Sequence, residues 1–284
     1  GDKLRIEKIV LETAIEYAAM VARESLLDRI AREHGACVER RRIRETEIIK
    51  ENELERLPHP NQEIYHSTFD CAVSSFNIAI SENWEFFQSV FPSIRLLPYE
   101  EQREFFRLCV PQFALAECFY RTKQTLVFTN FSLMCSLFMC AEITNPEQWI
   151  SQNEPNRVEL IGSLHAHSKE QMGIIVPSFE KSDICDRELH ALLALLLCEA
   201  DIHSDLADRF KLFLHNVRTE ILKDLYRFYT VEMKLTDYST RLGNLLTISH
   251  TFREGNGLFQ EYFRMQVTIF DLYVSATQLQ DLFL

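Results

Sequence analysis

Residues 91–122 read FPSIRLLPYEEQREFFRLCVPQFALAECFYRT, and this stretch decides the fold. Pro92 ends the apolar segment before it, because proline lacks the N–H and the conformational freedom that a helix interior needs. Pro98 suits the first turn of a new helix, and the carboxylates of Glu100 and Glu101 favour the positive end of its macrodipole. The stretch therefore predicts a turn followed by a long, largely apolar helix.

The segments before this stretch predict two further helices. In residues 61–91 and 3–33, apolar residues recur at steps of three and four, which places them on one face of an α-helix. Residues 38–57 alternate charge signs with few apolar residues. We expect a solvated helix or mobile connector there, ended by Pro58 and Pro60.

The segments after this stretch are helical in pattern except for one ambiguous region. Residues 126–150 fit either a short strand pair or more helix, and residues 151–186 hold most of the turn-forming residues. Asp186–Ala200 is apolar nearly all round, which indicates a helix covered on every side. The remaining predicted helices span residues 203–233, 238–254 and 258–273, with Gly255-Asn256-Gly257 as an interruption. Pro111 predicts a break or kink in its helix.

Composition indicates a helical protein and shows neither the basic charge typical of nucleic-acid binding nor an apolar run typical of a membrane span. Gly and Pro number only 7 and 8 among 284 residues, and hydrophobic residues make up 46%. The formal charge of −12 repels phosphate backbones, so we do not expect this chain alone to bind DNA. No apolar run reaches the roughly 18 residues that predict a membrane span.

The sequence contains no recognisable catalytic or metal-binding constellation. The eight cysteines are scattered through apolar segments with no CxxC pair, which favours reduced thiols in an intracellular protein. We find no GxSxG, HExxH, P-loop or dinucleotide motif. His165 and His167 form a close pair without a third candidate ligand nearby. We therefore predict no enzyme, no metal and no cofactor.

Several segments, in the correct order, resemble the ligand-binding domain of nuclear hormone receptors. Phe91-Pro92 resembles the turn that closes helix 3, and Leu97-Pro98-x-Glu100-Glu101-Gln102 resembles the family's L-P-x-[DE]-[DE]-Q motif. Glu188-Leu189 resembles the start of helix 8, and Arg241-Leu242-Gly243-x-Leu245-Leu246 resembles the R-[FL]-x-x-L-L start of helix 10. The overall style is similar to the nematode-expanded branch, which is related to fatty-acid-binding and retinoid receptors.

The resemblance implies an all-α, three-layer antiparallel helical sandwich, and it leaves open one small β-hairpin. Residues 1–284 would form a single ligand-binding domain. It would comprise an N-terminal helix and charged connector (1–57), then the sandwich core and a C-terminal activation helix (61–284). This would be the ligand-binding and dimerisation domain of a transcription factor in the nucleus, with a DNA-binding zinc-finger domain upstream.

The resemblance also implies a pocket for a lipophilic ligand. Its lining would be Val73, Phe76, Asn77, Ile80, Ala114, Leu115, Cys118, Arg121, Phe259, Tyr262 and Phe263. These residue types equally suit an ordinary core, and the bulk of the aromatic ones keeps a ligand-independent orphan domain as an alternative.

Arg121 matches the helix 5 arginine that binds a ligand carboxylate in the fatty-acid and retinoid branches. A guanidinium keeps its charge and offers a planar fork of donors to a carboxylate. We therefore expect a fatty acid or another acidic lipid anchored by Arg121. The alternative is a surface arginine favoured by the macrodipole at the end of a helix.

By the same resemblance, coactivators or corepressors would bind a groove whose two charges clamp a short LxxLL helix. Ser89 occupies the position of the clamp lysine, and Glu85 and Arg103 fall where apolar residues are common. We therefore expect weak or altered coactivator binding. The implied groove residues are Glu85, Ser89, Gln102, Arg103, Phe106, Arg107, Leu279, Asp281, Leu282 and Phe283.

The family pairs through helix 10 about a two-fold axis, so we expect a homodimer or heterodimer. The implied dimer contacts are Gly243, Leu246, Thr247 and Arg253. By resemblance alone, Glu188 and Arg241 would form an intramolecular ion pair. A helical lipid carrier or protein-interaction scaffold without a transcriptional role is the competing function from another class.

Overall fold

A computed structural model of the chain describes residues 8, 11–12, 24–125, 132–142, 146–199 and 204–270, but not the side chains of 199, 204–209 and 266–270. The helices are α2 (Leu26–Glu51), α3 (Phe69–Val90), η1 (Pro92–Leu96), α4 (Tyr99–Thr125), η3 (Pro146–Gln148), α5 (Arg157–Glu180), α6 (Asp186–Glu199), α7 (Ser204–Arg227), the π-helical turn η4 (Phe228–Glu232) and α8 (Ser239–Phe270). The strands are β1 (Arg56–Leu57), β2 (Ile64–His66), β3 (Ser132–Met134) and β4 (Met139–Glu142).

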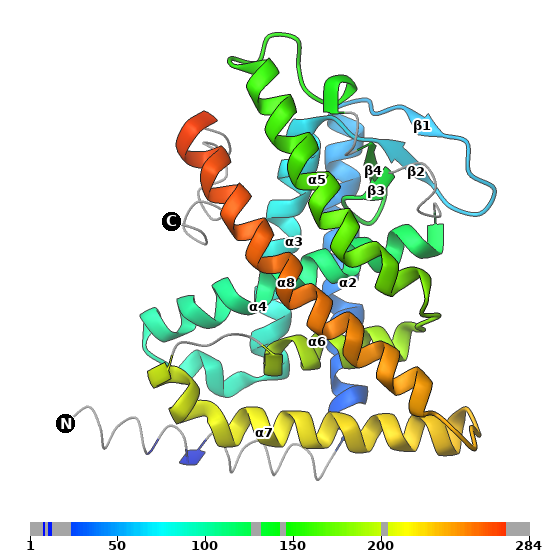
Figure 1. Cartoon of the computed structure of the whole chain (residues 1–284), viewed down its shortest axis with the longest axis vertical. Helices are drawn as coiled ribbons and strands as arrows, with labels where there is room; N and C mark the ends of the chain where they lie inside the picture. Colours follow the sequence, from blue (N-terminus) through cyan, green and yellow to red (C-terminus); the bar gives the residue numbers. More distant parts are fainter. Residues whose placement is uncertain are drawn as a thin grey trace.

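The helices form three layers, as predicted (Figure 1). α4 and α6 lie in the middle, because they pack against α3 and α2 on one side and against α8 on the other, while α5 packs on α8 and α4. α7 packs against α6 and α2. The residues from Leu189 to Leu197 are buried except His190, which confirms that this helix is covered on every side.

A small sheet with strand order β1-β2-β4-β3 lies beside the helices (Figure 1). The β3–β4 hairpin confirms the strand pair allowed by the pattern of residues 126–150. β2 pairs with β4 in parallel, with Tyr65 opposite Met139, and β1 pairs with β2 in antiparallel register. The sequence did not indicate β1 and β2, because strands of two and three residues are too short to show a period of two.

The N-terminal part of the chain differs from the prediction in two ways. Ser25 caps the start of α2 by accepting a hydrogen bond from the Asp28 N–H, so the predicted helix over 3–33 is interrupted there. Most of its first half lies outside the described residues. α2 then continues to Glu51, which confirms the helical alternative for this stretch but ends it before Pro58. The helix is not wholly solvated, because Arg41 and Glu45 are only 2% and 0% exposed.

Three other expectations are corrected. The turn-rich interpretation of residues 151–186 is wrong, because Arg157–Glu180 is one helix that includes Gly162, Gly173 and Pro177. α4 continues through Pro111, so the break that was one of the two alternatives there is absent. α8 continues through Gly255-Asn256-Gly257, where none of the described glycines has a positive φ.

Gly255 has a packing role in α8 and does not end the helix. A Cβ atom at this position would lie 2.8 Å from Cδ1 of Ile175 in α5, whereas a Cβ at Gly257 would meet nothing within 4 Å. Ile175 is fully buried, so its side chain has little room to move. The absence of a side chain at Gly255 therefore allows α5 and α8 to approach closely.

These two glycines form a matched pair for a stability test. We expect Gly257→Ala to raise the free energy of unfolding by up to about 1 kcal/mol, because alanine favours a helix. Gly255→Ala gains the same propensity but overpacks Ile175, so we expect a net loss of about 1–2 kcal/mol. Urea unfolding of both variants measures the difference, and equal shifts of the two midpoints would contradict the packing role.

Candidate ligand-binding site

An apolar cavity of about 140 Å³ lies between α3, α4, α5, α8 and the hairpin. The lining residues are Phe69, Ala72, Val73, Phe76, Leu115, Cys118, Leu133, Cys135, Trp149, Leu164, His167, Ser168, Gln171, Phe259 and Phe263. Most of this surface is hydrocarbon or aromatic ring, so the cavity suits a lipophilic molecule. It is smaller than the roughly 300–1,000 Å³ of common ligand pockets, so only a small molecule fits without rearrangement.

The structure brings together part of the predicted pocket. Val73, Phe76, Leu115, Cys118, Phe259 and Phe263 line the cavity. Asn77, Ile80, Ala114, Arg121 and Tyr262 are not among its lining residues. Ile80 and Ala114 instead pack with Val110 and Phe263 in an adjoining apolar cluster, and Tyr262 stacks on the cavity residue His167 at a ring distance of 4.7 Å.

The wall formed by α5 was missed. Leu164, His167 and Gln171 follow each other at steps of three and four and share one face of this helix. The sequence carries that helical spacing, but the neighbouring glycines and proline locally favour turns. Burial lowers the pKa of His167 from 6.5 to about 4, so its imidazole is neutral near pH 7.

Arg121 lines a different, more polar cleft together with Tyr120, Asp183 and Arg241. Its Nη2 atom lies 3.9 Å from Oε1 of Glu117, one turn earlier in α4. The guanidinium thus lies beside this buried carboxylate and the polar cleft, and not among the residues that line the apolar cavity. A ligand carboxylate confined to that cavity would therefore not meet Arg121.

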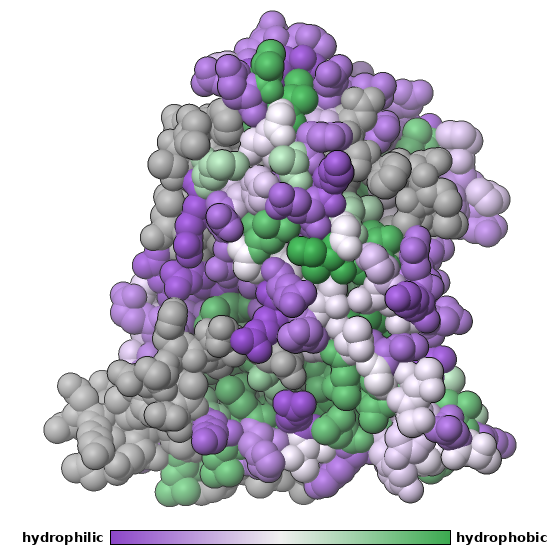
Figure 2. Space-filling view, viewed as in Figure 1, coloured by the Kyte–Doolittle hydropathy of each residue, from purple (hydrophilic) through white to green (hydrophobic). Residues whose placement is uncertain are grey.

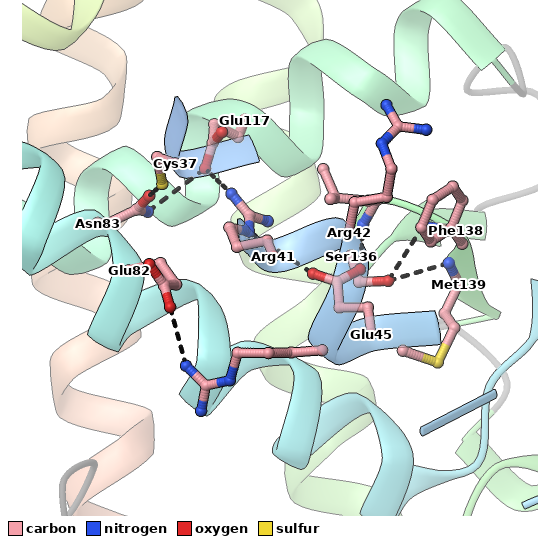
Figure 3. A network of polar contacts seen from close by, with 12 residues as sticks. Cys37, Arg41, Arg42, Glu45, Glu82, Asn83, Glu117, Ser136, Phe138 and Met139 are labelled. Carbon is pink, nitrogen blue, oxygen red and sulfur yellow. Dashed lines mark hydrogen bonds and ion pairs between the residues drawn. The ribbon is translucent and has the colours of Figure 1, made fainter. Parts of the chain in front are cut away.

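Glu117 is the centre of a buried polar network between α2, α3 and α4 (Figure 3). His34 Nε2 and Arg41 Nη1 each donate to it at 2.7 Å, and Asn83 Nδ2 donates at 3.3 Å. Burial alone would raise the pKa of Glu117, but Arg41 and His34 outweigh it and hold that pKa well below its usual range. The carboxylate is therefore ionised at neutral pH.

The network continues from Arg41 to the β3–β4 hairpin (Figure 3). Arg41 Nε lies 3.5 Å from Oε1 of Glu45, and Oε2 of Glu45 accepts a hydrogen bond from the backbone N–H of Leu137 at 2.9 Å. Burial raises the pKa of Glu45, and Arg41 opposes this shift. One buried arginine thus connects α4 to the hairpin that carries Leu133 and Cys135 of the cavity wall.

The predicted groove residues gather where α3, η1 and α4 meet. Arg95 pairs with Glu85 at 2.8 Å, and the Ser89 carbonyl accepts a hydrogen bond from Arg29. Gln102 Nε2 donates to the Leu97 carbonyl at 2.8 Å. Phe106 packs edge-on against Trp84, while Arg103 and Arg107 lie on the same part of α4. Leu279, Asp281, Leu282 and Phe283 lie outside the described residues.

The predicted dimer residues lie along the outer side of α8. Gly243, Thr247 and Arg253 are exposed, and Leu246 is half-buried. On this face of the molecule, apolar side chains are interspersed with polar ones (Figure 2). The predicted ion pair is confirmed, because Arg241 Nε donates to Oε1 of Glu188 at 2.6 Å, and Tyr229 donates to the same oxygen at 2.8 Å.

Among the described residues, no group of three or more His, Cys, Asp or Glu side chains could hold a metal ion. The helices of the described segments include none that is long and apolar enough to cross a membrane.

Removal of the charge at Glu117 tests the buried network. We expect Glu117→Gln to lower the free energy of unfolding by about 3–5 kcal/mol, because it leaves Arg41 buried without its main counter-charge. Arg41→Met in the same chain should recover part of the loss. The control is Glu82→Gln, which breaks more exposed pairs with Arg40 and Arg44 and should cost less than about 1 kcal/mol. Similar losses for the two single variants in guanidinium unfolding would refute this role.

The neutral state of the buried His167 imidazole predicts that the free energy of unfolding depends on pH. Between pH 6.5 and pH 4 the unfolded chain binds a proton at this residue that the folded chain excludes, so stability falls as the pH falls. His167→Phe keeps a ring against Tyr262 and removes the titration. From pH 7 to pH 5 we expect the wild type to lose about 2 kcal/mol more than this variant, measured by urea unfolding. Parallel stability curves for the two proteins would count against the buried neutral imidazole.

Comparison with known proteins identifies the family. The family model for the ligand-binding domain of nuclear hormone receptors matches residues 58–266, which is more than half of the chain. No curated protein matches the chain. The family is a non-enzymatic ligand-binding domain, and its helical sandwich with a small sheet agrees with the layers described above. The chain therefore belongs to the family of nuclear hormone receptor ligand-binding domains.

Proposed function

We propose that this chain forms a single domain that regulates transcription in the nucleus by binding a lipophilic molecule and coregulator proteins. The observation that carries the proposal is the apolar cavity between α3, α4, α5 and α8 within the matched region. Five aromatic side chains line it, so a lipophilic ligand would lose water-exposed apolar surface on binding. These side chains are Phe69, Phe76, Trp149, Phe259 and Phe263.

Coregulators would bind where α3, η1 and α4 meet. The proposal of weak or altered LxxLL binding is supported by Ser89, which offers no cation, and by the ion pair between Glu85 and Arg95. Loss of one charged clamp contact would cost roughly 1.5–3 kcal/mol of binding free energy. A peptide with charged residues beside its apolar ones would suit this surface better.

Dimerisation would use the exposed side of α8 around Gly243, Thr247 and Arg253. A stripe of half-buried and exposed residues on a long helix can pack against its own copy about a two-fold axis. Anchoring of an acidic lipid by Arg121 also remains a prediction, and it would require the ligand to reach the polar cleft that Arg121 lines.

A cavity-filling variant tests the proposal in a reporter assay. The whole chain is fused to an unrelated DNA-binding domain, and reporter activity is measured in cultured cells. We expect Val73→Trp, which fills the cavity, to change the activity by at least about threefold, which corresponds to only ~0.7 kcal/mol. Val158→Trp is the control, because Val158 is 77% exposed on α5 and should leave the activity unchanged.

The possible outcomes separate the alternatives. Unchanged activity in both variants would favour a ligand-independent orphan domain. No effect of any fusion, relative to the DNA-binding domain alone, would favour a carrier or scaffold without a transcriptional role.

A further inference from the structure

Three residues that line the apolar cavity, which we call its polar wall, carry buried polar atoms that lack partners. Nε2 of His167, Nε2 of Gln171 and Nε1 of Trp149 are each buried without a hydrogen-bond partner. All three residues line the cavity, and the side chains of His167 and Gln171 are only 8% and 5% exposed. Buried polar groups are normally paired, because an unpaired one loses its hydrogen bonds to water without replacement. These atoms therefore suggest a partner that enters the cavity.

The chemistry of the three groups defines that partner. The indole N–H of Trp149 and the amide NH₂ of Gln171 can only donate, and a neutral imidazole can donate from Nε2. His167 is the neutral form near pH 7, because burial lowers its pKa to about 4. The wall thus offers donors without a positive charge, and such donors suit an uncharged oxygen that accepts hydrogen bonds.

An ionised ligand does not fit the same wall. The described residues that line the cavity include neither lysine nor arginine, and Arg121 lines the separate polar cleft. A carboxylate moved into this apolar cavity would lose its hydration without gaining a counter-charge, and the free-energy cost would be large.

The size and lining of the cavity limit the rest of the ligand. A cavity of about 140 Å³ is close to the roughly 150 Å³ that accommodates a benzene-sized molecule. The rings of Phe69, Phe76 and Phe259 lie among its lining residues and favour contact with another ring.

We propose that this cavity takes a small, neutral, cyclic lipophile with one carbonyl or hydroxyl oxygen, which accepts hydrogen bonds from Gln171, Trp149 and His167. The inference rests on the proposed function, because it specifies the ligand of the same cavity. It differs from the acidic lipid expected from the sequence in both the charge of the ligand and the residues that bind it.

Three probes of nearly equal shape test the inference by isothermal titration calorimetry with the full chain. Acetophenone carries a carbonyl oxygen, α-methylstyrene replaces that oxygen with a CH₂ group, and benzoate carries a negative charge. We expect acetophenone to bind about five- to tenfold more tightly than α-methylstyrene, the worth of an ordinary hydrogen bond. Benzoate should bind more weakly than either.

A matched pair of variants assigns the effect to the polar wall. Gln171→Met keeps the volume and removes the donor, so it should reduce acetophenone affinity about three- to tenfold and leave α-methylstyrene affinity unchanged. Retained binding of α-methylstyrene shows that the variant is folded with its cavity intact. Gln112→Met is the control, because Gln112 is buried at 2% exposure and does not line the cavity.

Each of the other outcomes would contradict one specific part of the proposal. Equal affinities of acetophenone and α-methylstyrene would overturn the hydrogen-bonding role of this wall and leave a purely apolar cavity, so that the proposed function stands. Tightest binding by benzoate would overturn the neutral ligand in favour of an acid. Failure of all three probes to bind would remove the cavity as a ligand site and would contradict both proposals.

Discussion

The buried carboxylate of Glu117 is the constraint on which most of the surrounding structure depends. An ionised group with 2% exposure is tolerated only if charges and donors surround it, and here they come from two other helices. α2 must therefore present His34 and Arg41 to α4, and α3 must present Asn83. This requirement explains why a helix with so many charged residues lies partly inside the protein.

The same network is connected to the wall of the ligand cavity, although its charged residues do not line that cavity. Arg41 pairs with both Glu117 and Glu45, and Glu45 binds the hairpin whose residues Leu133 and Cys135 form part of the wall. Breaking the network would therefore affect the cavity through the position of the hairpin. The apolar wall from α3 and the α5 part of the polar wall depend on ordinary helix packing instead.

Much of the fold could be predicted from local pattern and motif resemblance. The periodicity of residues 61–91 and the continuous apolar run after Asp186 identified α3 and α6. The motifs around Pro98 and Arg241 supported the family resemblance, which implied the three-layer arrangement. The burial of α2 beyond residue 38 was not predicted, because partners far away in the chain decide whether a charge is buried, and Glu117 is separated from Arg41 by 76 residues. α5 was missed because glycine and proline inside a helix carry the same local signal as a turn.

The candidate site was predictable only in its apolar half. Val73 and Leu115 followed from matched positions, but Arg121 lines the polar cleft and lies beside Glu117, a residue that no motif includes. His167 and Gln171 required a helix that the sequence did not reveal.

α8 is one unbroken helix from Ser239 to Phe270, so it links distant parts of the molecule rigidly. At a rise of about 1.5 Å per residue, Tyr262 and Gly243 lie roughly 28 Å apart along one stiff rod. The close approach of α8 to Ile175 at Gly255 lies between them. Tyr262, which stacks on the cavity residue His167, and the predicted dimer residue Gly243 therefore belong to one continuous helix.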